Sequence, residues 1–127
     1  MKIAIFENEY PSVQGAFDAA NLIDFNNQLT VKVFPSSQSA NFQEMKEYEV
    51  IFVDIDLSTK SQLDGFGVIN KIKECDNSLT NRIVILTGNS KIEEILSERG
   101  IERDGIQIII KPTNFTEISN AINNVKK

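Results

Sequence analysis

The sequence predicts an α/β fold in which a five-stranded parallel sheet lies between two layers of helices. The chain has 127 residues, a length that suits one compact domain with a single core. Five short apolar runs, rich in branched residues, alternate along it with segments of helical periodicity. Such strict alternation favours a parallel sheet, because right-handed crossovers place helices on both faces. We therefore expect residues 1–127 to form one doubly wound domain.

Four of the apolar runs contain almost no polar residue, which is typical of strands covered on both faces. They span residues 3–6, 50–53, 83–86 and 108–110. The remaining run, residues 31–34, alternates more and follows the polar segment Asn26 to Gln28. A strand with one partly wet face has this pattern, so we expect residues 31–34 to form an edge of the sheet.

Apolar residues spaced three and four positions apart predict the helices between these strands. The helical patterns lie around residues 13–20, 41–47, 68–72, 92–96 and 115–125. Two helix starts carry the residues of a capping box, Ser90 with Glu93 and Asn114 with Glu117. The order of elements predicts a flavodoxin-like fold, with strand order 2-1-3-4-5 and helices on both faces.

Charge and composition exclude several classes of function. The formal net charge of -5 opposes binding to a phosphate backbone, so no nucleic-acid partner is expected. The apolar runs fall far short of the roughly 20 residues that cross a bilayer. Because no signal-peptide segment precedes the first strand either, we expect a cytoplasmic protein with no membrane partner. The absence of histidine excludes histidine-based catalytic triads and HExxH zinc sites.

Polar side chains follow the apolar runs at the points where the strands should end. They are Glu7, Asn8 and Glu9 after the first run, Asp54 and Asp56 after the third, Thr87 after the fourth and Lys111 after the fifth. Each one alone has an ordinary explanation, because strand ends meet solvent. Ligands of doubly wound sheets bind beyond the carboxyl ends of the strands, however, and acids, a hydroxyl and a lysine converging there suit phosphoryl chemistry. Converging carboxylates repel each other unless a cation lies between them, and a hard oxygen site with few protein ligands suits Mg²⁺.

The pattern from Lys2 to Val125 resembles that of response-regulator receiver domains of the single-domain, CheY-like type. The resemblance implies that Asp54, in the sequence Val-Asp-Ile, accepts a phosphoryl group. It implies that Thr87 contacts this group and that Lys111, followed by a cis proline, helps to stabilise its charge. Asp64-Gly65 resembles the turn that precedes the third helix of the family.

The same resemblance implies a Mg²⁺ cofactor. Its ligands would be Glu7, Asn8, the carboxylate of Asp54 and the backbone carbonyl of Asp56. Asn8 departs from the family pattern, which usually has a second acid at this position. An amide oxygen is a poorer ligand for Mg²⁺ than a carboxylate, so we expect weakened metal binding.

Two further departures lie close to the expected site. Ile108, three residues before Lys111, stands where the family usually has an aromatic residue that moves with the phosphoryl-sensing hydroxyl. The loop of residues 55–64 is longer than in the common pattern, and Ser58 to Ser61 replace a usual proline. The longer loop is either a tolerated surface insertion, because lengthening a flexible loop costs little free energy, or a partner-specific contact.

The function implied is that of a receiver in a two-component phosphorelay. A histidine kinase or histidine phosphotransfer protein would phosphorylate Asp54, and the resulting conformational change would signal to a downstream protein whose identity the sequence does not give. The chain ends soon after the last predicted helix, so no attached output domain is expected. We expect no enzymatic turnover beyond slow self-dephosphorylation, and a monomer or weak homodimer.

Two other functions remain open at this level. Asn8 and Ile108 are consistent with a pseudo-receiver that binds its partner without being phosphorylated. Residues 52–59 also resemble the DxDxT motif of haloacid-dehalogenase-type phosphatases, in which the second Asp, here Asp56, is a general acid. Against the phosphatase, the motif falls on the third predicted strand, and no acidic pair follows Lys111 to complete a metal site.

Overall fold

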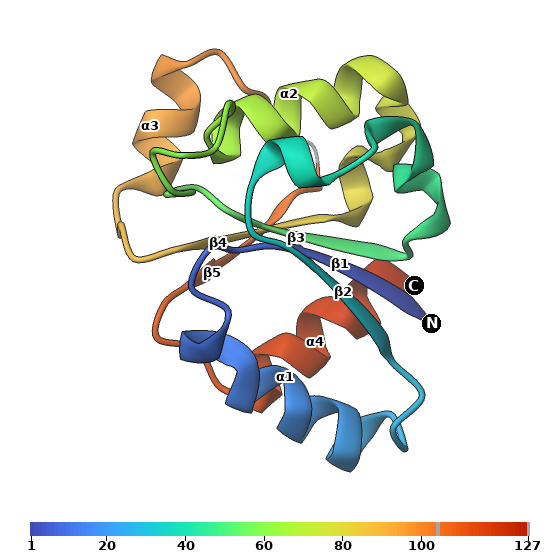
Figure 1. Ribbon diagram of the computed structural model, residues 1–127. Helices are drawn as coiled ribbons and strands as arrows, with labels where there is room; N and C mark the ends of the chain where they lie inside the picture. Colours follow the sequence, from blue (N-terminus) through green and yellow to red (C-terminus); the bar gives the residue numbers. More distant parts are fainter. Residues whose placement is uncertain (104, 127) are drawn as a thin grey trace.

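The computed structural model describes residues 1–103 and 105–126, and its centre is a parallel sheet of five strands (Figure 1). The strands are β1 (Lys2–Phe6), β2 (Thr30–Phe34), β3 (Val50–Asp54), β4 (Ile83–Thr87) and β5 (Gln107–Ile110). Their order in the sheet is β2-β1-β3-β4-β5, and every neighbouring pair runs parallel. This confirms the flavodoxin-like fold. The prediction of one domain over residues 1–127 includes Asp104 and Lys127, which lie outside the described residues.

Helices cover both faces of the sheet (Figure 1). On one face lie α1 (Pro11–Asp24) and α4 (Phe115–Lys126); on the other lie α2 (Gly65–Cys75) and α3 (Ile92–Glu98). The segment between β2 and β3, expected to be helical, forms the 3₁₀ helix η2 (Phe42–Glu47), while η1 (Ser37–Ser39) and η3 (Asn77–Arg82) are further short 3₁₀ helices. Within the described residues, no helix has the length and apolar character needed to cross a bilayer.

The strands bury alternate side chains in two separate apolar layers. Every residue of β3 is buried, so its apolar run serves both faces of the sheet. Phe52 points toward α1, where its ring meets the ring of Phe17 edge-on with the centroids 4.9 Å apart. On the other face Phe6 stacks with Phe34 at 5.0 Å and belongs to the layer under α2. Period-two burial of this kind explains the unbroken apolar runs in the sequence.

The two edge strands differ from each other in how well they were predicted. β2 is an edge strand with alternating exposure, as its sequence pattern indicates. β5 forms the opposite edge, as the predicted strand order requires. The expectation that both of its faces are covered is wrong, because only one of its four residues is fully buried. Ile110 is 39% exposed and Ile108 is half-buried. A short run of branched residues does not distinguish a buried strand from an apolar edge strand.

One of the two predicted helix caps is present. The side chain of Asn114 accepts a hydrogen bond from the backbone N–H of Glu117 at 3.0 Å, as expected of an N-cap. The prediction for Ser90 is wrong, since α3 begins at Ile92 and has no side-chain cap bond. The side chain of Asn89 instead accepts the N–H of the residue after Ser90, at 2.9 Å, and forms a local turn there.

Candidate functional site

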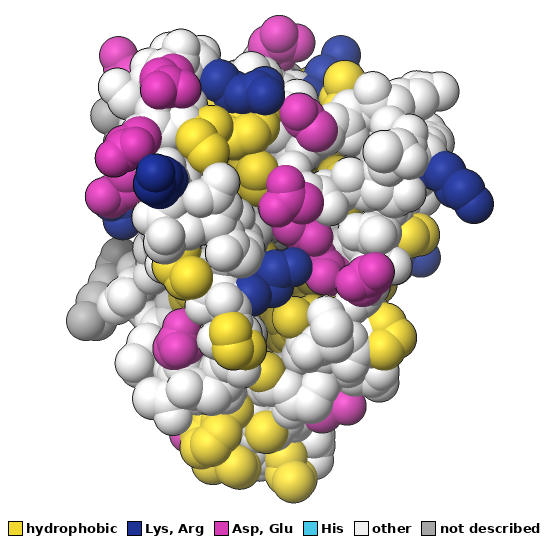
Figure 2. Space-filling model, turned by 90° about the vertical axis from the view of Figure 1, so that its left-hand side faces the viewer, with side chains coloured by type: hydrophobic (Ala, Val, Ile, Leu, Met, Phe, Trp, Pro, Cys, Tyr) yellow, Lys and Arg dark blue, Asp and Glu magenta, His cyan; other side chains and the backbone are white. Residues whose placement is uncertain are grey.

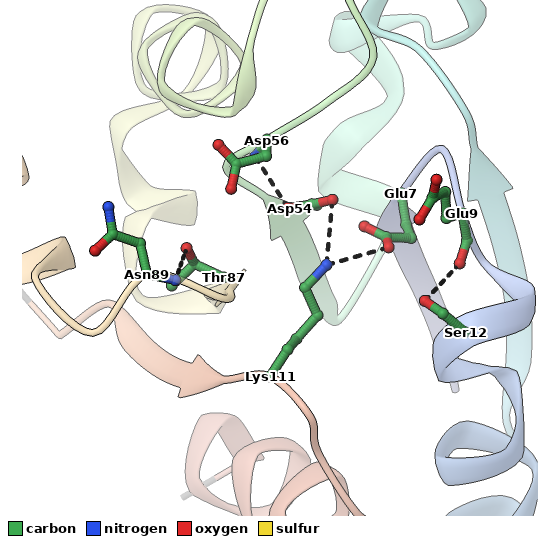
Figure 3. A network of polar contacts seen from close by, with 8 residues as sticks. All are labelled: Glu7, Glu9, Ser12, Asp54, Asp56, Thr87, Asn89 and Lys111. Atoms are coloured by element: carbon green, nitrogen blue, oxygen red, sulfur yellow. Dashed lines mark hydrogen bonds and ion pairs between the residues drawn. The ribbon is translucent and has the colours of Figure 1, made fainter.

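Four of the predicted site residues lie at the carboxyl ends of adjacent parallel strands (Figure 3). Glu7 directly follows β1, Asp54 ends β3, Thr87 ends β4 and Lys111 directly follows β5. The register brings the ends together, because Phe6 pairs with Val53 and Thr87 pairs with Ile110. Figure 2 faces this edge and has acidic side chains gathered beside a basic one near its centre.

Lys111 holds the two acidic residues of this edge together. Its Nζ lies 3.3 Å from Oε1 of Glu7 and 3.4 Å from Oδ2 of Asp54. The carboxylates are almost inaccessible, since Glu7 is 1% exposed and Asp54 is 3% exposed. Buried charges of one sign need a counter-charge, and Lys111 reaches from the edge strand to supply it.

One lysine does not fully compensate two buried carboxyl groups. Burial, together with the proximity of Asp54, raises the pKa of Glu7 to about 8, although Lys111 acts in the opposite direction. Burial alone would lower the pKa of Lys111, but the negative charges of Asp54 and Glu7 outweigh this effect and raise it. In the metal-free protein near neutral pH, Lys111 is therefore charged and Glu7 holds a proton.

The backbone around Asp54 fixes the direction of its carboxylate. Oδ1 accepts a hydrogen bond from the N–H of Asp56 at 2.9 Å, which leaves Oδ2 facing Lys111. α2 begins directly against this backbone: a Cβ at position 65 would lie 2.4 Å from the carbonyl oxygen of Asp54 and 2.4 Å from Cα of Ile55. Gly65 is thus the residue that the turn predicted at Asp64-Gly65 requires, and the side chain of Asp64 caps α2 by accepting the N–H of Gly67 at 2.8 Å.

Thr87 lies at the same edge but outside the group of ion pairs. It is fully buried, and its Oγ1 accepts a hydrogen bond from the N–H of Asn89 at 3.1 Å. Figure 3 places it on the opposite side of Asp54 from Glu7. Sequence reasoning did not identify Asn89 as part of the site, although an Asn two residues after a strand-end Thr is a common turn signal.

Asn8 and Asp56 are both exposed. The Asp56 carboxylate points away from Lys111, so the backbone of Asp56 is the part of this residue that faces the site (Figure 3). The structure does not bring Asn8 into a hydrogen bond with any residue that it describes. Glu9, which follows it, places its carboxylate on the Glu7 side of the edge (Figure 3). Within residues 1–103 and 105–126, no three acidic, Cys or His side chains are close enough to hold a metal by themselves.

The oxygen atoms that are present nevertheless fit Mg²⁺. Oε2 of Glu7 is buried and has no hydrogen-bond partner among the described residues, so it is an acceptor in need of a proton or a cation. The carboxylate of Asp54 lies beside it, and the Asp56 carbonyl accepts no hydrogen bond from the described part of the chain. Mg²⁺ in proteins is typically bound by one or two carboxylates and keeps several waters, and this donor set is of that kind.

Comparison with known proteins gave matches among solved structures alone; no family model and no curated protein sequence matches this chain. The bacteriophytochrome response regulator AtBRR superposes with a TM-score of 0.73 at 17% identity, over 98% of this chain and 91% of that one. The receiver domain of NtrX from Brucella abortus gives 0.69 at 21% identity, over 98% of each chain.

A third neighbour is the receiver domain of the sensor histidine kinase PA1611 from Pseudomonas aeruginosa PAO1. It gives a TM-score of 0.70 at 20% identity, over 99% of this chain and 98% of that one, and its structure has a magnesium ion coordinated in the active site cleft. Identities this low establish the fold and leave the chemistry to the residues themselves. The chain has the fold of the response regulator receiver domains, over nearly its whole length.

Proposed function

We propose that this chain is a two-component receiver that accepts a phosphoryl group on Asp54 and signals to a partner protein. The observation that carries the proposal is the position of the Lys111 ammonium between Glu7 and Asp54, at the edge where doubly wound sheets bind their ligands. A carboxylate that can act as nucleophile, a second acid, a buried hydroxyl and a fixed cation lie there at the ends of four different strands. The receiver fold of the structural neighbours supports the same function.

Phosphoryl transfer requires an oriented nucleophile and positive charge near the transferring oxygens. With Oδ1 of Asp54 held by the Asp56 N–H, Oδ2, which faces the Lys111 ammonium, is the oxygen that would attack phosphorus. The new Oδ2–P bond forms as the bond from phosphorus to the donor breaks, and the leaving group keeps the electron pair. Lys111 supplies positive charge on one side, and a bound Mg²⁺ would neutralise charge on the phosphoryl oxygens.

The signal would arise because phosphorylation changes the charge balance at Lys111. A phosphoryl group on Asp54 adds negative charge and acceptor oxygens that compete with Glu7 for the Lys111 ammonium. The Thr87 hydroxyl, which accepts the N–H of Asn89, can donate its own hydrogen and would turn toward the new oxygens. Such a turn would move the loop after β4, which leads into α3. The half-buried Ile108 on β5 would take the place of the aromatic residue that the family usually has.

The proposed phosphoryl source is a histidine kinase or a histidine phosphotransfer protein, and the output is a protein contact. Incubation of the purified chain with Mg²⁺ and acetyl phosphate, followed by intact-mass measurement, tests the first step. The parent should gain the mass of one phosphoryl group, Asp54→Asn should gain none, and Asp56→Asn should still be labelled. Labelling of Asp54→Asn, with the acyl phosphate mapped to Asp56 or Glu7, would contradict the assignment.

The second candidate is a pseudo-receiver, favoured by the exposed Asn8 and by the lack of a three-carboxylate cluster among the described residues. It predicts that the parent gains no mass under the same conditions while the fold stays intact. Asn8→Asp separates a weak receiver from a pseudo-receiver. The added carboxylate should increase labelling if metal affinity is the limiting factor, and should change nothing if the site performs no chemistry.

A further inference from the structure

The longer loop between β3 and α2 is hydrogen-bonded to the turn that follows β2. Gln38 uses both ends of its carboxamide, because Nε2 donates to the carbonyl of Lys60 at 2.8 Å and Oε1 accepts the N–H of Gln62 at 2.9 Å. Ser37 makes two bonds to the same loop: its N–H donates to Oγ of Ser61 at 2.8 Å, and its Oγ accepts the N–H of Leu63 at 2.9 Å. We call these four hydrogen bonds the clasp.

The clasp is specific and partly shielded from water. Ser37 is 3% exposed, although it belongs to a turn of polar residues. The hydroxyl of Ser61 accepts from Ser37 and donates to the carbonyl of Leu63 at 2.6 Å, so it is fixed from both sides. Buried polar groups of this kind are costly to leave unpaired. The clasp therefore gives the middle of the loop one preferred position.

The ends of the same loop are tied to the candidate site. The N–H of Gly65 donates to the carbonyl of Ile55 at 3.1 Å, which closes residues 55–64 into a compact Ω-shaped loop. Its first residues, Ile55 and Leu57, are buried in the apolar layer under α2. Between them lies Asp56, whose N–H binds Oδ1 of the acceptor Asp54. One loop therefore carries both the clasp and the backbone that orients Asp54 (Figure 1, Figure 3).

We propose that Ser37 and Gln38 are positioning residues for the Asp54 site. By holding the middle of the 55–64 loop, the clasp keeps the N–H and the carbonyl of Asp56 beside the acceptor before a cation or a phosphoryl donor arrives. A site ordered in advance does not have to lose loop entropy on binding, and its affinity is higher for that reason. The effect of the clasp on ligand binding rests on the proposed function, whereas its effect on the position of Asp56 does not.

A purely local role of the clasp would have a different effect on amide exchange. The amide of Gln62 donates to Gln38 and that of Leu63 donates to Ser37, so each must exchange faster when its own acceptor is removed. The amide of Asp56 lies outside the clasp and donates to Asp54. Faster exchange at Asp56 therefore reports whether the loop transmits the position of the clasp to the acceptor.

The experiment compares Gln38→Ala and Ser37→Ala with the control Ser39→Ala, in the full chain. Ser39 lies in the same turn, but its hydroxyl donates to the carbonyl of Ser36 and does not touch the loop. We expect the two clasp variants to show faster exchange of the Asp56 amide and a Mg²⁺ dissociation constant raised about tenfold, the lower end of the loss typical for outer partners of metal ligands. Ser39→Ala should match the parent in both, and Ser37→Thr, which keeps the hydroxyl, should restore parent-like exchange.

Unchanged exchange at Asp56 in Gln38→Ala, together with faster exchange at Gln62, would overturn the proposal. The side chain of Gln38 is exposed, so this variant remains informative even where Ser37→Ala fails to fold. A parent protein that neither binds Mg²⁺ nor gains a phosphoryl group would refute the proposed function, and the Asp56 amide would still decide for or against the clasp. Unchanged Mg²⁺ affinity with faster Asp56 exchange would overturn the link from the clasp to ligand binding.

Discussion

Glu7 has a charge state that makes the stability of the protein depend on pH. Its pKa is raised from 4.5 to about 8 in the folded state, mainly by burial. Between these values the folded chain holds a proton that the unfolded chain releases, so stability falls as the pH rises through this window and levels off above it. Without a metal, the deprotonated Glu7 carboxylate is the unfavourable form of the site.

Glu7→Gln should therefore be more stable than the parent above about pH 8 in metal-free buffer. The expected gain is on the order of a few kcal/mol, because one pKa unit corresponds to about 1.4 kcal/mol. Urea unfolding of both proteins across the window measures it. The exposed Glu44 gives the control, since Glu44→Gln removes the same charge without relieving burial. If the difference in unfolding free energy between the parent and Glu7→Gln is the same at every pH, the pKa of Glu7 is not raised.

Asp56 is the residue on which the DxDxT resemblance of residues 52–59 depends. The backbone of Asp56 contacts the site, whereas its carboxylate is exposed and points away from Lys111 (Figure 3). A general acid has to reach the leaving group, so this arrangement favours the receiver over the phosphatase alternative. The sequence places Asp56 two residues after Asp54, but the direction of its side chain depends on how the loop closes.

At the scale of single elements, the start of α2 leaves no room for a side chain larger than that of glycine. Gly65→Ala would place a Cβ 2.4 Å from backbone atoms of Asp54 and Ile55, which cannot move without disturbing β3. We expect this variant to lose several kcal/mol of stability, in the range of severe overpacking, together with Mg²⁺ binding. Thermal unfolding and Mg²⁺ titration measure the two losses.

Gly15→Ala is the matched control for this substitution. Gly15 lies on the exposed side of α1, and a Cβ there meets no atom within 4 Å. Because Ala is the better helix former by up to about 1 kcal/mol, this variant should be as stable as the parent or slightly more stable. Equal destabilisation by the two substitutions would mean that the close approach of α2 to Asp54 is not what Gly65 provides.

Elements with a periodic pattern were predictable from the sequence, and contacts between irregular segments were not. The strands and the helices α1 to α4 follow from apolar spacing, which depends on nearby residues in the sequence alone. The Ser90 cap failed because Asn89 competes for the same turn. The clasp could not be predicted from the sequence. It joins polar residues 22 to 26 positions apart in two loops, and nothing in the composition of either loop indicates that the two are in contact.

At the scale of the whole molecule, Mg²⁺ binding should appear as increased stability. A cation that binds the folded chain alone raises its stability in proportion to the logarithm of the free cation concentration. We expect Mg²⁺ to raise the melting temperature, and chelation to reverse the effect. Protons compete with the cation for Glu7, so the shift should be larger above the Glu7 pKa of about 8 than below it.

Two variants of the site test whether the Mg²⁺-dependent shift in melting temperature arises there. Asn8→Asp adds a carboxylate at the exposed rim and should enlarge the Mg²⁺-dependent shift, whereas Glu7→Gln should reduce it. If Mg²⁺ does not change the melting temperature of the parent or of either variant at any pH, this edge of the sheet binds no cation. The overall fold could be predicted from the sequence alone, because the alternation of strands and helices limits a chain of this length to few topologies.

The hydrogen bond from Lys111 to Glu7 joins residues that are 104 positions apart. During synthesis the chain exposes Glu7 and Asp54 long before Lys111, so β1 and β3 can first pair with both acids uncompensated at their ends. Arrival of β5 brings the missing positive charge into place beside them. Docking of the last strand is thus favoured by charge as well as by apolar contact, and a nascent chain that still lacks β5 holds Asp54 without the ammonium of Lys111 beside it.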